Sequence, residues 1–254
     1  MKYILSLFSI LMLSSSMSYA QLKVNKSKKL LIYTKNGEGY VHENIATSVA
    51  TLQEICKKLG VKTVVSNQPK IFTSEEMDSF DGVFFLNTNN EAFDTQLQKQ
   101  AFQNFCRNRK GFGALHSATG SERDWPWYWS LIGGTFVRHA PFQTFSVDVI
   151  DATHPSTKNL SKRFEVTDEC YYIKNLNPDI HVLLAADLTT VNDPKIKNYP
   201  SNTFYQSFPI AWYHNFEGGR QWYSSLGHSN EIYALKYFQD HLEGGIKYLL
   251  QLND

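Results

Sequence analysis

Four side chains in this sequence are of the types that transfer protons or bind metals near neutral pH: His42, His116, Glu169 and His228. Imidazole and carboxyl groups suit general acid/base catalysis because their surroundings readily tune their pKa values. Three histidines and a glutamate also form a donor set that suits Zn²⁺ or Mn²⁺. Long intervals separate the four residues, so either chemistry requires the fold to bring them together.

One of these residues follows an apolar run directly. Residues 111–118, GFGALHSA, predict a strand and a small-residue turn, where a nucleophile elbow presents its side chain. A glutamine amidotransferase needs a cysteine there, because a thiolate attacks an amide near neutral pH. The position holds His116 and Ser117 instead, and Cys106 falls in the preceding predicted helix. We therefore expect no glutamine hydrolysis. A purely structural alternative is that His116 caps the strand by hydrogen bonding.

The elements that must position these side chains alternate in the first half of the chain. Short apolar runs predict strands, and apolar residues at helical spacing predict the helices between them. Continuous apolar strands indicate a parallel sheet covered on both faces, with ligands at the carboxyl ends of the strands. The predicted fold is α/β, a doubly wound, mostly parallel sheet flanked by helices. Its strands are residues 30–33, 61–65, 82–86 and 112–115, and its helices are residues 45–59, a segment starting at 73–76, and 94–107.

The second half is less regular. We expect strands at residues 145–150, 181–185, 209–213 and 221–226, with a turn at 217–219. Residues 232–250 predict a long helix that breaks near Gly244 and Gly245. Residues 189–204 contain few apolar side chains and two prolines, and we interpret them as a loop that could cover a site.

The elbow belongs to a series of motifs that resembles the trehalose-utilisation (ThuA-like) family. The others include residues 125–128 (WPWY), 131–136 (LIGGTF), 168–171 (DECY), 209–212 (PIAW) and 219–228 (GRQWYSSLGH). The resemblance covers nearly the whole chain after residue 28. It implies a class I glutamine amidotransferase-like (flavodoxin-like) fold over residues 28–252 and a link to sugar utilisation. The resemblance predicts the fold better than the mechanism, because one fold can support many different reactions.

Aromatic residues crowd the same motifs, which is typical of a sugar site. Sugar rings pack their C–H faces on aromatic planes and leave their hydroxyls to polar partners. Core packing is the alternative for each aromatic taken singly. The expected substrate contacts are Ser117, Trp125, Tyr128, His139, Gln143, Tyr171, Trp212 and Arg220.

The first twenty residues predict export. Lys2, the apolar residues 4–13 and Ser18-Tyr19-Ala20 form a signal peptide with cleavage after Ala20, and residues 21–27 form a short linker. The apolar run is too short for a membrane anchor, so we expect a periplasmic or extracellular protein with no membrane insertion after cleavage. Losing Lys2 leaves 24 basic against 24 acidic residues, and the scattered basic residues exclude a nucleic-acid partner. Three cysteines do not make a disulfide framework. The sequence is compatible with a homo-oligomer as well as with a monomer.

Two functions are consistent with these patterns. The first is an enzyme of the isomerase, lyase or hydrolase type that performs acid/base chemistry, with or without a divalent metal, on a small sugar or oxidised sugar. In it His42, His116, Glu169 and His228 act as catalytic residues or as metal ligands. The second is a non-catalytic sugar-binding module that kept the pocket after losing the amidotransferase nucleophile.

Overall fold

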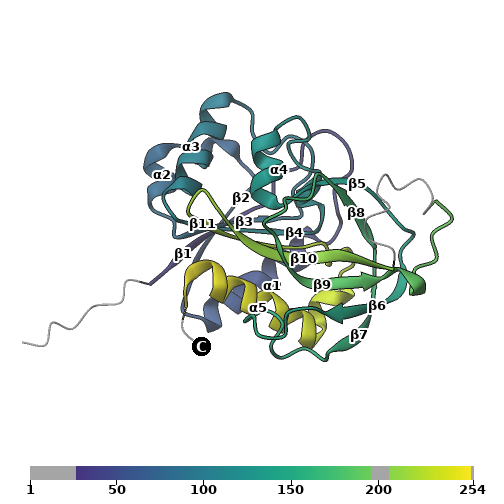
Figure 1. The fold of residues 1–254 in the computed structure, drawn as a ribbon. Helices are drawn as coiled ribbons and strands as arrows, with labels where there is room; N and C mark the ends of the chain where they lie inside the picture. Colours follow the sequence, from purple (N-terminus) through teal and green to yellow (C-terminus); the bar gives the residue numbers. More distant parts are fainter. Residues whose placement is uncertain (1–26, 196–205, 253–254) are drawn as a thin grey trace, which may run out of the picture.

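We describe a computed structural model of the chain over residues 27–195 and 206–252 (Figure 1). Nine of the described strands form one sheet in the order β2-β1-β3-β4-β11-β10-β9-β6-β7. The sheet is parallel from β2 to β11 and antiparallel from β11 to β7. In order along the chain, its strands are β1 (Lys29–Tyr33), β2 (Lys62–Ser66), β3 (Gly82–Leu86), β4 (Gly111–Leu115), β6 (Gln143–Val149), β7 (Arg163–Asp168), β9 (His181–Asp187), β10 (Ser207–Phe216) and β11 (Gly219–Ser224).

Helices cover both faces of the parallel half, which confirms the predicted α/β class (Figure 1). Apolar residues at helical spacing bury one face of α1 (Ile45–Lys58), and α1 packs against α5 (Lys236–Leu250). The opposite face carries α2 (Ser74–Asp78), α3 (Gln96–Arg107) and α4 (Pro126–Ile132). Thr95 begins α3 with a reciprocal capping box to Gln98. Strands β3 and β4 are buried along their whole length, as their continuous apolar sequences predict.

Strand order reverses at β1, which lies between β2 and β3. The loops after β1 and β3 diverge at such a point and leave a crevice at the carboxyl edge of the sheet. His42 follows β1, Asn89 follows β3, and His116 follows β4 directly. The topology therefore brings loops that are distant in the sequence to one edge.

A tight hairpin joins the last two strands at the predicted turn. Glu217 and Gly218 form its two-residue loop, with φ values of 46° and 89°, between the paired residues Phe216 and Gly219. Both loop residues have positive φ, as a type I′ turn requires. The hairpin returns the chain from antiparallel β10 to β11, whose parallel neighbour is β4.

Three strands of the second half were not predicted. Strand β7 forms one edge of the large sheet, while β5 (Thr135–His139) and β8 (Tyr171–Lys174) pair with each other in a separate two-stranded sheet. Their sequences mix polar and apolar residues and lack the continuous apolar run of β3. These segments form strands because they pair with other strands in the fold, and not because their local sequence favours a strand.

The predicted helix break at Gly244 and Gly245 is wrong. Helix α5 runs through both glycines, and the interruption falls at Leu235, between a 3₁₀ turn at Glu231–Ala234 and α5. A β-carbon on Gly244 would lie 2.2 Å from the carbonyl oxygen of Pro155, and one on Gly245 would lie 2.8 Å from the Trp222 ring. These glycines permit close packing of the helix instead of ending it.

The remaining predictions have mixed outcomes. Cys56, Cys106 and Cys170 are buried and free, and a buried free cysteine packs as a small apolar residue. In the predicted loop, residues 188–190 form a 3₁₀ turn, and residues 196–204 lie outside the described part. The signal peptide and residues 21–26 of the linker lie outside it too. Among the described helices, none has the length and apolar character to span a membrane.

Candidate active site

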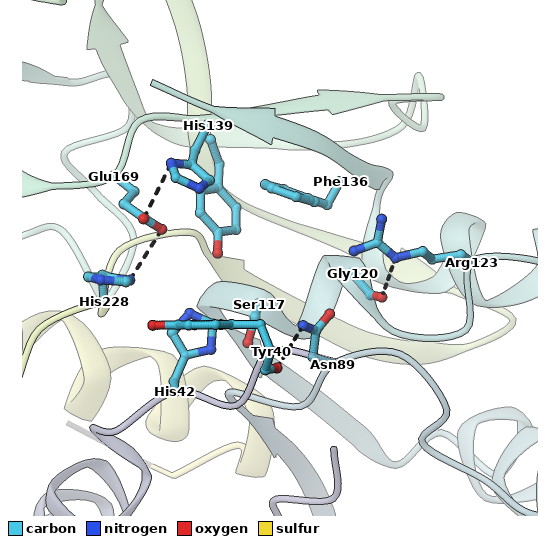
Figure 2. Close-up of a pocket in the computed structure, with 11 residues that line it drawn as sticks. Tyr40, His42, Asn89, Ser117, Gly120, Arg123, Phe136, His139, Glu169 and His228 are labelled. Carbon is cyan, nitrogen blue, oxygen red and sulfur yellow. Dashed lines mark hydrogen bonds and ion pairs between the residues drawn. The ribbon is translucent and has the colours of Figure 1, made fainter. Parts of the chain in front are cut away.

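A cavity of about 380 Å³ opens at the carboxyl edge of the parallel strands (Figure 2). Loops after β1, β3, β4 and β11 form one side of it, and the segment from β5 to β8 forms the other. The volume falls within the range of about 300–1,000 Å³ that is usual for small-molecule sites. Its lining residues are Tyr40, His42, Asn89, Ser117, Gly120, Arg123, Phe136, His139, Glu169, Tyr171 and His228.

His116 occupies the elbow with a positive φ of 51°, which a residue with a β-carbon rarely adopts. Its backbone carbonyl accepts a hydrogen bond of 2.9 Å from the Tyr223 hydroxyl. The ring Nδ1 donates to the carbonyl oxygen of Ser225 at 2.7 Å, since a carbonyl can only accept. The Nε2 atom of the neutral ring is therefore an acceptor, and it faces the other three side chains and the Tyr171 hydroxyl.

The structure brings the four expected residues together. His116 Nε2 lies 3.0 Å from His42 Nε2, 3.4 Å from His228 Nδ1 and 3.7 Å from Glu169 Oε2. One ligand-type atom from each of the four lies within 4.8 Å of the other three. We call His42, His116, Glu169 and His228 the histidine-glutamate cluster.

Glu169 is the carboxyl member of the cluster and lies between two histidines (Figure 2). Its Oε2 is 3.2 Å from His228 Nδ1, and its Oε1 is 3.3 Å from His139 Nδ1. The hydrogen bond that His228 donates to the Glu169 carboxylate raises the pKa of His228 above its ordinary value. His139 Nδ1 also lies 2.8 Å from the carbonyl oxygen of Ala140. The Glu169 carboxylate thus orients the ring of His228, inside the cluster, and the ring of His139, outside it.

Burial keeps the two deepest histidines neutral. Desolvation lowers the pKa of His42 to about 4, with the charge of His228 adding to the effect. Desolvation also lowers the pKa of fully buried His116 well below its usual range. Neutral imidazole is the form that offers a lone pair to a metal or accepts a proton. Both rings are therefore in the ligand or base form at neutral pH.

The donor set fits a divalent metal ion. Four ligands held tetrahedrally at about 2.1 Å from zinc lie about 3.4 Å from one another, and four pairs in the histidine-glutamate cluster are 3.0 to 3.7 Å apart. Metal-bound histidines usually donate their second N–H to a carbonyl or carboxylate, as His116 does to Ser225. Within the described residues, buried His42 Nδ1 has no hydrogen-bond partner.

Two buried residues outside the cavity lining hold the cluster loops in place. Asp168 is fully buried and accepts backbone N–H groups from Glu169 at 2.8 Å, Gly227 at 2.7 Å and His228 at 3.3 Å. Burial raises its pKa to about 7, against the opposing effect of these three donors. Asn44 donates to the carbonyl oxygens of Gly227 and His228. Sequence reasoning missed both roles, because an acidic or amide side chain carries no local sign of burial.

Three of the eight expected substrate contacts line the cavity: Ser117, His139 and Tyr171. The Tyr171 hydroxyl lies 3.0 Å from His116 Nε2, and burial raises the Tyr171 pKa well above its usual value. The hydroxyl therefore stays protonated and can donate a hydrogen bond. Ser117 presents a buried Oγ that has no partner among the described residues.

The other five lie outside that lining, and packing or hydrogen bonding occupies each of them. Tyr128 and Trp212 are fully buried and donate to the backbone carbonyls of Ala118 and Ile132. Trp125 stacks on Trp127, with ring centroids 5.0 Å apart. Gln143 exchanges hydrogen bonds with the backbone of Asn192, and Arg220 donates to the carbonyls of Tyr248 and Leu249 at the end of α5. Sequence alone could not separate these core and capping roles from ligand contacts.

Five lining residues were not predicted. Tyr40 comes from the loop before α1, Asn89 follows β3, and Phe136 lies on β5; Gly120 and Arg123 follow the elbow turn. Arg123 donates from Nε to the Gly120 carbonyl at 3.0 Å, with its guanidinium 5.7 Å from the Phe136 ring centroid. Position after a predicted strand could have indicated Tyr40 and Asn89 as it did His42. Phe136 lies on a strand that the sequence did not reveal.

Comparisons with known proteins agree with this architecture. The structure is similar to a ThuA-like protein from Bacteroides uniformis, with 22% identity, a TM-score of 0.69, and coverage of 95% of this chain and 97% of that one. A ThuA-like protein from Parabacteroides merdae shows 19% identity, a TM-score of 0.66 and coverage of 89% and 90%. A GMP synthase component from Thermoplasma acidophilum, with 14% identity, a TM-score of 0.54 and coverage of 89% and 96%, shares the amidotransferase-like fold.

No curated protein matches the sequence. The ThuA family, described as trehalose utilisation, matches residues 29–249, which is most of the chain and includes every member of the histidine-glutamate cluster. The chain therefore belongs to the ThuA family, whose general role is carbohydrate utilisation.

Proposed function

We propose that this protein is an exported, divalent-metal-dependent enzyme that performs acid/base chemistry on a small carbohydrate. The observation that carries the proposal is the convergence of the histidine-glutamate cluster, whose four ligand-type atoms lie within 4.8 Å of one another. His42, Glu169 and His228 line the cavity, and fully buried His116 lies behind them. A divalent ion held there would polarise a substrate oxygen and stabilise negative charge as it develops.

The hydrogen-bond geometry of the cluster favours an ion over a purely protonic arrangement. His116 Nε2 has one lone pair, which the Tyr171 hydroxyl at 3.0 Å can fill, yet two histidine nitrogens also approach it at 3.0 and 3.4 Å. If His42 Nε2 donates to it, the buried His42 Nδ1 becomes an acceptor without a partner among the described residues; if Nδ1 holds the proton, two lone pairs face each other. A cation among these lone pairs removes the conflict at the crowded centre.

Two groups beside the cluster are suited to move protons. His139 contacts Glu169 and lines the open side of the cavity, so its ring can exchange protons with substrate and with water. Burial keeps the Tyr171 hydroxyl protonated. With an ion on His116 Nε2, this hydroxyl would be released from His116 and could donate a hydrogen bond to a substrate oxygen. Phe136 and Tyr40 offer ring faces to a sugar, while Asn89 and Arg123 offer polar contacts to its hydroxyls.

Metal content tests the centre of the proposal. Protein stripped with a chelator and titrated with Zn²⁺ or Mn²⁺ should bind one ion per chain, as measured by calorimetry and elemental analysis. His228→Ala and Glu169→Gln should each weaken that binding at least about tenfold, because each removes a donor. His181→Ala is the matched control, since His181 is an exposed histidine on β9 outside the cluster. Unchanged ion binding in both cluster variants would refute the assignment.

Turnover separates an enzyme from a binding module. Metal-loaded protein should convert at least one member of a panel of mono- and disaccharides, detected by mass spectrometry, and the cluster variants should lose that conversion. Sugar binding without any product after long incubation would support the module instead.

The N-terminus of the mature protein tests export. Protein recovered from the periplasm or medium should begin at Gln21, and a chain that retains residues 1–20 would contradict export.

A further inference from the structure

A second cavity of about 410 Å³ adjoins the candidate active site and shares two lining residues with it, Tyr40 and His228. His228 belongs to the histidine-glutamate cluster, so one cluster residue forms part of the walls of both cavities. A ligand that reaches from one cavity to the other passes beside the cluster. The other lining residues are Glu43, Asn44, Phe142, Ser229, Asn230 and Glu231.

Two aromatic rings stand exposed on this second cavity. Tyr40 is 60% exposed and Phe142 is 46% exposed, which is unusual for side chains of this size. Each contacts the cluster: the Tyr40 ring lies 4.8 Å from His42, edge-on, and the Phe142 ring lies 5.5 Å from His228. Rings that remain exposed at the rim of a polar cavity offer their faces to the C–H faces of a sugar.

The polar lining determines which ligand fits. Glu43 and Glu231 contribute carboxylates, while Ser229 and Asn230 contribute neutral groups, so hydroxyls find both acceptors and donors. Among the described lining residues there is no lysine or arginine, whereas the first cavity has Arg123. Two carboxylates without a lysine or arginine to offset them disfavour an anion such as a sugar phosphate or a sugar acid. An uncharged, hydroxyl-rich ring suits the cavity.

We propose that the second cavity is the subsite for the second ring of a neutral glycoside whose first ring occupies the active-site cavity. The bond between the rings then lies beside His228, at the boundary that the two cavities share. The inference rests on the proposed carbohydrate function and deepens it by placing the second ring of the glycoside against the exposed rings of Tyr40 and Phe142.

Calorimetry on the metal-loaded mature chain tests this with matched one-ring and two-ring probes. The pairs are methyl α-glucoside with trehalose and methyl β-galactoside with lactose. In at least one pair, the two-ring sugar should bind about tenfold or more tightly than its one-ring partner. Phe142→Ala removes the exposed ring and Asn230→Trp fills the cavity; each should cut that advantage to less than about threefold. Leu97→Ala is the control, because Leu97 is 76% exposed on α3, outside both cavities.

The possible results separate the second-ring subsite from the carbohydrate function on which it rests. One-ring binding with no two-ring advantage, or an equal loss for both probes in the Phe142 and Asn230 variants, overturns the subsite and leaves the carbohydrate function standing. An advantage that survives both variants also overturns the subsite, because the second ring then lies elsewhere. No binding of any probe overturns the carbohydrate function, and the subsite with it.

Discussion

His241 provides a test of how burial governs the histidines of this fold. The residue lies on α5 and is 1% exposed, with Nδ1 donating to the Ser156 carbonyl at 2.9 Å and its ring 5.0 Å from that of Trp222. Within the described residues, its Nε2 has no hydrogen-bond partner. Desolvation lowers the His241 pKa from 6.5 to about 4. Protonation in the folded state is therefore unfavourable.

The sign and size of the pH effect follow from that pKa. Because the folded pKa is below the unfolded one, the stabilisation is present above about pH 6.5 and is lost as the pH falls towards 4. A lowering of about 2.5 pKa units corresponds to about 3.4 kcal/mol at most. Integrated between pH 7.5 and 5.0, one such histidine contributes about 2 kcal/mol of lost stability.

The variant His241→Gln isolates this contribution. A glutamine amide can still donate to the Ser156 carbonyl but never becomes charged. Denaturant unfolding at pH 7.5 and pH 5.0, on chelator-treated protein, should show that wild type loses about 2 kcal/mol more than the variant between the two pH values. His181→Gln, at an exposed histidine, should lose as much as wild type. Equal pH dependence in wild type and His241→Gln would refute the role given to burial.

Three further changes have defined outcomes. Asp168→Asn replaces an acceptor oxygen with an NH₂ group that faces the N–H donors of Glu169, Gly227 and His228, so divalent-ion affinity should fall about 10- to 100-fold by calorimetry; unchanged affinity would show that Asp168 does not position the cluster. His139→Gln should lower kcat with full metal content by elemental analysis, and a parallel loss of metal would instead make His139 a ligand. Gly244→Ala places a β-carbon 2.2 Å from the Pro155 carbonyl oxygen and should cost at least about 1–3 kcal/mol in thermal unfolding; a wild-type melting curve would contradict the close packing of α5.

The parallel half of the fold could be predicted because its local signals agree with its tertiary structure. Strand β3 is apolar at every position and buried at every position, so sequence pattern and burial coincide. The same holds for α3, where a capping box and an apolar stripe give the start and the buried face. Strands β5, β7 and β8 could not be found this way, since their partners lie far along the chain and their mixed sequences are compatible with loops.

The cluster could be predicted because loops after parallel strands meet at one edge of a sheet. His42, His116 and His228 each follow a strand of the parallel half, and topology alone brings such positions together. The aromatic contacts could not be predicted, because the sequence around Trp212 and Tyr128 looks the same whether their rings contact a sugar or pack in the core. Their full burial and the hydrogen bonds of their polar ends to backbone carbonyls distinguish the two.

The histidine-glutamate cluster draws its members from both halves of the sheet. Its three histidines follow strands β1, β4 and β11 of the parallel half, while Glu169 lies between β7 at the far antiparallel edge and β8 of the small sheet. An ion shared by these residues would act as a cross-link between segments that are distant in the chain. Folding and metal supply would then be thermodynamically linked: at a free ion concentration about 100 times the Kd, the native state gains about 2.7 kcal/mol. Resistance to proteolysis should rise with metal availability in the compartment where the protein resides.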